Sequence, residues 1–334
     1  MLRIVVLILL CSLVTTNGYG AEGAVTQPAL TGDLKIHDPT AIEVDGMFVA
    51  FATGFEGGID RGALRIKTSP DGIAWTDRGA LGKGLPAWVP PALGVKPPNL
   101  WAPTISRRGD IFYLYYAASI FGVNTSAIGL ATNVHFDPQH PADGWIDQGL
   151  VLKTGIKDSF NAIDPFRVDT PDGRAWLSFG SYWDGIKLRE LDPVSGKLKP
   201  DAATLYGLAS RHGAAIEASS IIEHAGHYYL FVSYDRCCSG ITSTYHIMVG
   251  RADAVTGPYL DQNGKPMLQG YATLVERSDG RFIGPGGQEA FKTPAGDMLV
   301  YHYYDGADGG TSKLELAPLR WSADGWPTLD PLPE

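Results

Sequence analysis

The sequence predicts an all-β fold, a five-bladed β-propeller in a single domain, on three observations. The first is composition: 41 glycines and 23 prolines among 334 residues favour many short strands and tight turns over long helices. The second is a set of five apolar, mostly aromatic segments, which are 47–51, 111–116, 175–179, 227–232 and 297–301. The third is their spacing: their centres lie 53 to 71 residues apart, which leaves room for four short strands in each unit.

Each of these segments is expected to be a strand that follows a hairpin turn. Two-residue turn signals occur at Asp45-Gly46, Gly109-Asp110, Asp172-Gly173, Ala225-Gly226 and Gly296-Asp297. A weaker strand signal follows in every unit, at 63–67, 127–131, 186–191, 245–250 and 314–317. No linker or shift in composition divides the chain after residue 21, so we expect one domain over residues 21–334.

The first 20 residues predict a secretory signal peptide. Arg3 supplies a positive charge, residues 4–14 are apolar, and small residues near Gly18 and Gly20 offer a cleavage site. A membrane anchor is the alternative, but this apolar run is shorter than the roughly 20 residues that a spanning helix needs. We therefore expect a secreted protein, extracellular or periplasmic, without a membrane partner.

Charge and cysteine content narrow the class of partner. The net charge is −9, the isoelectric point is near 5.4, and no basic run occurs, which argues against nucleic acid and anionic membranes. A neutral partner fits better, such as a neutral side chain of pectin. After the signal only Cys237 and Cys238 remain, too few for a usual zinc site. These adjacent cysteines either form a vicinal disulfide or stay reduced.

Three acids recur at one place in the repeat. Asp38, Asp164 and Glu217 lie 10 or 11 residues before Phe48, Ala175 and Tyr228, which are the first or second residues of three of the apolar segments. Equivalent positions in a propeller converge on one mouth of the central channel, and clustered carboxylates are what glycoside hydrolysis requires. Asp38 and Asp164 precede prolines, where an Asp also stabilises turns. Glu217 lies in an apolar run, where an unpartnered carboxylate costs several kcal/mol, and this favours a functional role.

Five motifs carry a resemblance to a known family. They are His37-Asp38-Pro39, Asn161-Ala162-Ile163-Asp164-Pro165-Phe166, Ser181-Tyr182-Trp183, Ala215-Ile216-Glu217-Ala218, and Cys237-Cys238-Ser239-Gly240 with Ser243-Thr244-Tyr245. With these motifs in this order, the chain resembles glycoside hydrolase family 43, and within it the endo-1,5-α-L-arabinanases. The resemblance implies arabinan as substrate, inversion at the anomeric carbon, and no cofactor for the chemistry. It also implies Asp38 as general base, Glu217 as general acid and Asp164 as the residue that tunes the acid.

The same resemblance implies residues that contact the sugar. They are Trp101, Phe121, Gly122, Asn161, Ser181, Tyr182 and Trp183. Packing between blades is the alternative role for Trp101, and a position in the core is the alternative for Trp183.

The resemblance also raises the question of a metal ion. Many relatives carry a histidine after a Gly-Pro-Gly run, near a calcium or sodium ion in the channel. Here that run is 284–286 and the next residue is Gly287. His302, on the same blade, could reach the channel instead; its alternative is a structural role.

Other functions fit the same residues. An exo-acting arabinanase or an arabinofuranosidase would use the same acids with one end of the groove blocked. A carbohydrate-binding propeller without turnover would need no cluster of three acids. A retaining relative would use one carboxylate as nucleophile, with the two carboxyl groups about 5 Å apart and not 6.5–9.5 Å.

Overall fold

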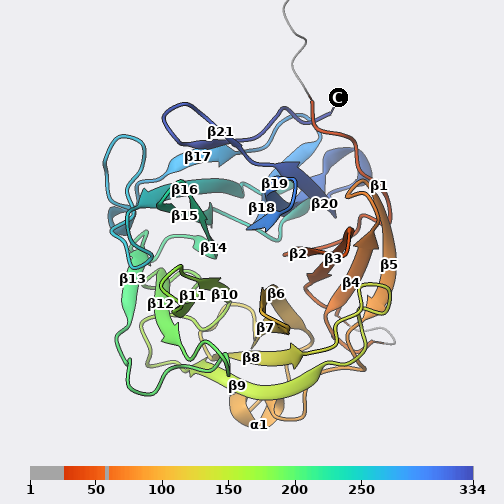
Figure 1. The fold of residues 1–334 in the computed structure, drawn as a ribbon, viewed down its shortest axis with the longest axis vertical. Helices are drawn as coiled ribbons and strands as arrows, with labels where there is room; N and C mark the ends of the chain where they lie inside the picture. The colour runs from red at the N-terminus through yellow and green to blue at the C-terminus, as the bar shows by residue number, and fades with distance from the viewer. Residues whose placement is uncertain (1–25, 57–59, 334) are drawn as a thin grey trace, which may run out of the picture.

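A ring of radial β-sheets surrounds a central axis in the computed structural model, which describes residues 26–56 and 60–333 (Figure 1). Over those ranges the sheets form five blades and a small additional β-hairpin. The predicted fold class, a five-bladed propeller in one domain, is thereby confirmed. The predicted signal peptide lies outside the described residues. None of the helices in the described ranges has the length and apolar character needed to cross a bilayer.

Each blade is an antiparallel meander whose first strand lies nearest the axis. The first blade contains β2 (Thr40–Val44), β3 (Met47–Ala52), β4 (Arg65–Ser69) and β5 (Ala74–Ala80). The second contains β6 (Leu100–Arg108), β7 (Ile111–Ser119), β8 (Ser126–Asn133) and β9 (Ile146–Thr154). The third contains β10 (Phe166–Asp169), β11 (Ala175–Phe179), β12 (Ile186–Leu191) and β13 (Tyr206–Ala209). The fourth contains β14 (Ile216–His224), β15 (His227–Tyr234), β16 (His246–Ala252) and β17 (Thr273–Glu276). The fifth contains β18 (Phe282–Thr293), β19 (Gly296–Asp305) and β20 (Thr311–Pro318).

The fifth blade is completed by the N-terminal segment. The amide of Ile36 donates to the carbonyl of Ser312 (3.1 Å), and the amide of Leu314 donates to that of Leu34 (2.9 Å). This pairing covers the outer edge of β20, which would otherwise be free to pair with another chain. Because Asp38 follows this segment directly, closure of the ring also fixes the first blade against the fifth.

Smaller elements complete the chain. A short strand, β1 (Thr31–Gly32), runs parallel to β5, and β21 (Arg320–Trp321) pairs with β22 (Pro327–Thr328). A short helix, α1 (Val89–Leu93), lies in the connection between β5 and β6. It has proline in its first turn and ends at Gly94 (φ 71°), both usual helix-boundary features that were not used in the prediction.

The apolar core lies between neighbouring blades. In the described ranges, five clusters of buried side chains fill the five interfaces; the one between the fifth and first blades joins Val300 and Leu316 to Ala50. Second strands are buried on both faces, as the uninterrupted burial of β11 shows. This explains why the strongest sequence signals were continuous apolar runs, while outer strands such as β5 alternate.

One predicted turn is displaced. Gly296 and Asp297 are the first residues of β19. Because Thr293 of β18 pairs with Gly296, the turn between the two strands is formed by residues 294 and 295. The Thr293 hydroxyl donates to the carbonyl of Gly296 (3.0 Å) and accepts from the amide of Ala295 (3.2 Å). A threonine that bonds the backbone in this way fixes the turn two residues earlier than the Gly-Asp pair indicated.

Candidate active site

The five inner strands share a distortion where the chain enters the blade. One residue in each inner strand, or just before it, adopts a left-handed conformation with φ between 36° and 58°; these are Asp38, Ala102, Asp164, Ala218 and Gly287. The preceding residue pairs with the second strand of the same blade in every case, as Glu217 does with Ser233. The left-handed residue interrupts the alternation of the strand, and in the first and third blades two consecutive residues, His37 with Asp38 and Ile163 with Asp164, line the same mouth of the channel.

This register corrects one prediction. Asp38 and Asp164 are themselves the left-handed residues of their blades, but Glu217 comes one residue earlier than Ala218, the left-handed residue of its own blade. The three acids therefore do not fill one identical slot. A spacing counted to the next strand could not resolve this one-residue offset, because the bulge that causes it lies within the counted interval.

The three acids nevertheless line one cavity of about 740 Å³ at the channel mouth. All seven predicted sugar-contacting residues line it as well, and they are Trp101, Phe121, Gly122, Asn161, Ser181, Tyr182 and Trp183. The cavity also includes lining residues to which the sequence analysis assigned no role: His37, Thr53, Glu56, Asn99, Ile120, Val123, Ile163, Gly213, Cys237, Cys238 and Tyr245. His302 does not line the cavity and is fully buried beneath it.

Glu217 is held by two hydroxyl groups. Ser181 donates to its Oε2 (2.7 Å) and Tyr245 donates to its Oε1 (2.9 Å). Burial raises the pKa of the Glu217 carboxyl, and the nearby charge of Asp38 raises it further, while these two hydrogen bonds oppose the shift. Ser181 therefore contacts the acid itself, a role that the sequence alone did not assign to it.

Asp164 accepts a hydrogen bond at Oδ2 from the amide of Ala218 (3.0 Å), next to Glu217 in the chain. Burial raises the pKa of Asp164 well above its usual value, and repulsion from Glu217 and then Asp38 adds to this. Because ionisation of both carboxyl groups would place two like charges side by side, the pair of Asp164 and Glu217 keeps one proton to a higher pH than an ordinary carboxyl group does.

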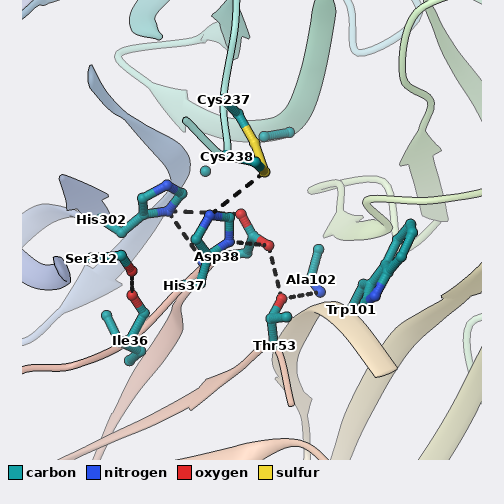
Figure 2. A network of polar contacts seen from close by, with 12 residues as sticks. Ile36, His37, Asp38, Thr53, Trp101, Ala102, Cys237, Cys238, His302 and Ser312 are labelled. Carbon is teal, nitrogen blue, oxygen red and sulfur yellow. Dashed lines mark hydrogen bonds and ion pairs between the residues drawn. A yellow bond between two sulfur atoms is a disulfide. The ribbon is translucent and has the colours of Figure 1, made fainter. Parts of the chain in front are cut away.

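Asp38 lies in the opposite electrostatic environment (Figure 2). The hydroxyl of Thr53 donates to its Oδ2 (2.8 Å), and Nδ1 of His37 lies 2.8 Å from the same oxygen. Burial alone would raise the pKa of Asp38, but the attraction and hydrogen bond of His37 outweigh it and lower the pKa to about 2. One carboxylate of the cavity thus stays ionised while the other two retain a proton more readily.

The remaining lining residues offer an aromatic and polar surface. Phe121 is 81% exposed and Tyr182 37% exposed, so both rings are free to contact a ligand. The indole of Trp101 is oriented by a hydrogen bond from its Nε1 to Oδ1 of Asn99 (2.9 Å). The amide oxygen of Asn161 accepts from Ser126 (2.6 Å), which fixes the orientation of that side chain.

The adjacent cysteines form a disulfide at the rim of this cavity. Of the two open alternatives, the structure therefore contains the oxidised form. The amide of Cys238 donates to the hydroxyl of Tyr304 (2.8 Å), which ties the disulfide loop to the fifth blade.

Comparison with known proteins identifies the family. The sequence model of Glycosyl hydrolases family 43 matches residues 25–327. The chain belongs to glycosyl hydrolase family 43. As a member of this family it is a glycoside hydrolase, and the resemblance inferred from the five motifs is confirmed.

Relatives of this family 43 protein include enzymes with two modes of action. It is 40% identical to the extracellular endo-α-(1→5)-L-arabinanase 1 of Bacillus subtilis over 88% of this chain and 87% of that protein. It is 36% identical to the extracellular exo-α-(1→5)-L-arabinofuranosidase ArbA of Cellvibrio japonicus over 89% of this chain and 87% of that protein. The solved structure of the family 43 endo-arabinanase from Bacillus licheniformis superimposes with a TM-score of 0.83 at 40% identity, covering 90% of this chain and all of that one.

Proposed function

We propose that this protein is a secreted endo-1,5-α-L-arabinanase that hydrolyses internal linkages of arabinan with inversion, using residues 21–334 as its catalytic domain. The observation that carries the proposal is the division of three carboxyl groups in one cavity into an ionised group and a proton-holding pair. The similarity to a named endo-arabinanase over most of both chains supports the substrate.

The proposed roles follow from this division. Asp38 is the general base, because a carboxylate that stays ionised can take a proton from the attacking water. Glu217 is the general acid, because a carboxyl group with a raised pKa can hold the proton that the departing sugar oxygen needs. Asp164 positions and tunes this acid through its charge and its bond to the amide of Ala218.

The proposal fits the residues around the acids. A neutral polysaccharide needs ring faces to stack on and hydrogen-bonding groups, and the cavity offers Trp101, Phe121 and Tyr182 beside Asn161. The two carboxyl groups and a water molecule suffice for the reaction, so no cofactor takes part in it.

Product analysis on debranched linear arabinan tests the substrate and the mode of action together. An endo-acting enzyme is expected to release a mixture of oligosaccharides early in the reaction and to reduce the viscosity quickly. A single short product from the first minutes would favour exo action, the second candidate, which the 36% identical exo-acting relative supports. No turnover of arabinan, with turnover of xylan or of an aryl arabinofuranoside, would contradict the substrate.

Inversion predicts the first-formed anomer. Proton NMR of the fresh hydrolysate is expected to show the β-anomer from α-linked arabinan before mutarotation, because one displacement by water reverses the configuration. Initial appearance of the α-anomer would instead support the retaining alternative, in which a carboxylate forms a covalent intermediate.

The pH profile provides a third prediction. Activity should persist at acidic pH until Asp38, with a pKa of about 2, is protonated, and it should fall at higher pH as Glu217 loses its proton. Asp164→Asn removes a negative charge beside Glu217, so the pKa of Glu217 should fall and the alkaline limb should move about one pH unit lower. The measurement is kcat/KM against pH, with the exposed Asp201→Asn as control. An unmoved limb would remove Asp164 from its tuning role.

A further inference from the structure

The amide groups of the left-handed residues are held from the preceding blade in a repeated way. Thr53 Oγ1 accepts from the amide of Ala102 (2.9 Å), and Ser233 Oγ accepts from that of Gly287 (3.1 Å). His302 Nδ1 accepts from the amide of Asp38 (3.1 Å), as Figure 2 shows. Thr53, Ser233 and His302 occupy the same position of their blades, since each pairs with the residue before the left-handed one. The imidazole of His302 therefore accepts the amide proton of Asp38 in the same way that the hydroxyl groups of Thr53 and Ser233 accept the amide protons of two other left-handed residues.

The second nitrogen of His302 is also engaged. Its Nε2 lies 3.3 Å from the hydroxyl of Tyr304, which lies 2.9 Å from Nε2 of His37 and accepts from the amide of Cys238. Because Nδ1 of His302 is an acceptor, the ring proton is on Nε2 and is donated to Tyr304. When His37 is neutral, the Tyr304 proton is donated to Nε2 of His37, whose own proton on Nδ1 faces Oδ2 of Asp38. This assignment satisfies every donor and acceptor of the three side chains.

Two of these residues, together with Asp38, also form one of the side-chain groups in the described ranges that could hold a metal ion. His37, Asp38 and His302 have ligand atoms within 4.8 Å of one another. Calcium and sodium prefer several oxygen ligands, and this group offers one carboxylate and two imidazoles. The nitrogens of both rings are already bonded to Asp38 and Tyr304, so no nitrogen lone pair is left for a metal. The residues present do not fit the expected calcium or sodium ion.

The absence of a side chain at Gly287 leaves the space that the imidazole of His302 occupies. A Cβ atom at position 287 would lie 2.6 Å from Oδ1 of Asp38 and 2.8 Å from Cε1 and Nδ1 of His302. The imidazole of His302, stacked on that of His37 with ring centroids 3.9 Å apart, thus fills the space into which a side chain at 287 would extend. A side chain at 287 and His302 in this position exclude each other.

We propose that His302 is a positioning residue that, with Tyr304 and His37, holds Asp38 in this protein by hydrogen bonds in place of an ion. This inference rests on the proposed role of Asp38 as general base. The network contacts Asp38 through both its backbone and its side chain. His302 accepts from the amide of Asp38, and His37 and Thr53 contact its carboxylate.

Metal analysis tests the ion without reference to activity. Elemental analysis by mass spectrometry should find far less than one calcium, zinc or manganese per chain in the protein as purified. The same result is expected for calcium after incubation with CaCl₂ and gel filtration into metal-free buffer. The melting temperature should be the same in CaCl₂, NaCl and KCl of equal ionic strength. About one tightly bound metal per chain, or a stabilisation specific to calcium or sodium, would overturn the proposal.

Substitutions test the positioning role. His302→Leu should lower kcat about 10–100-fold and leave KM within about threefold, because a misplaced base weakens the chemical step more than sugar binding. His302→Asn keeps an acceptor near the position of Nδ1 and should recover most of the loss. Tyr304→Phe should lower kcat with KM unchanged, whereas Tyr303→Phe, the adjacent tyrosine of β19, is the matched control and should not.

The outcomes separate the two proposals. Circular dichroism identifies any variant that fails to fold, in which case Tyr304→Phe and the metal analysis remain decisive. Wild-type kcat in folded His302→Leu, or in Tyr304→Phe, would overturn the positioning role while leaving Asp38 as base. Full activity of Asp38→Asn would instead overturn the assigned base, and the metal analysis would still stand.

Discussion

Replacing Glu217 by glutamine is expected to lower the hydrolysis of arabinan by about 10²–10⁴-fold, because the departing sugar oxygen then receives no proton from the enzyme. Ser181 and Tyr245 now donate to different carboxyl oxygens; the amide oxygen of glutamine can still accept from one of these hydroxyls, and its NH2 group can donate to the oxygen of the other, so the shape of the cavity should be retained. Binding of arabino-oligosaccharides, measured by calorimetry, should change little. The loss should therefore be in kcat and not in affinity.

The leaving group makes this prediction specific. An aryl arabinofuranoside with an acidic phenol needs little protonation, so Glu217→Gln should hydrolyse it at a rate much closer to that of the wild type. Glu223→Gln, at the far end of the same strand and outside the cavity, is the matched control and should be fully active. If Glu217→Gln lost activity equally on both substrates, Glu217 would not be the general acid.

The propeller architecture could be predicted from the sequence because each blade produces a local pattern, an apolar strand next to a turn. The second strands are buried on both faces, so each one is a continuous apolar run, and the runs recur at intervals set by four strands. The acids were found because their residue types are unusual where they occur. The ring closure by residues 34–36 was not predicted, since it joins residues about 280 positions apart and depends on no local pattern.

The partners of the acids were harder to foresee. Thr53, Ser181 and Tyr245 hold the carboxylates, yet a hydroxyl residue just beyond the end of a strand has no sequence signal for its partner. The one-residue offset of Glu217 from Ala218 arises from a strand bulge, which spacing cannot locate. His302 was singled out as a residue that could reach the channel, but its bond to the amide of Asp38 appears only when the fifth and first blades are placed side by side.

Replacing Asp38 by asparagine should lower the hydrolysis of arabinan by a similar factor, about 10²–10⁴-fold, because no group then removes a proton from the attacking water. Asparagine tolerates the left-handed conformation that Asp38 adopts (φ 47°), and its amide oxygen can still accept from Thr53, so the fold should be retained. Asp45→Asn is the matched control: Asp45 is also left-handed (φ 51°), at the opposite end of β2, and this variant should be fully active.

The Asp38 variants should regain activity under different conditions from Glu217→Gln. An aryl leaving group should not restore Asp38→Asn, because the missing step is activation of water. In Asp38→Ala, which leaves space beside the sugar, added azide should restore turnover, since this anion attacks without losing a proton; the product should be a β-arabinofuranosyl azide that NMR can identify. Rescue of Asp38→Asn by the better leaving group, or an azide product of α configuration, would contradict an inverting reaction with Asp38 as its base. Because the two carboxyl groups act on opposite ends of the same displacement, only this crossed pattern of rescue distinguishes a base and an acid from two carboxylates that merely bind the sugar.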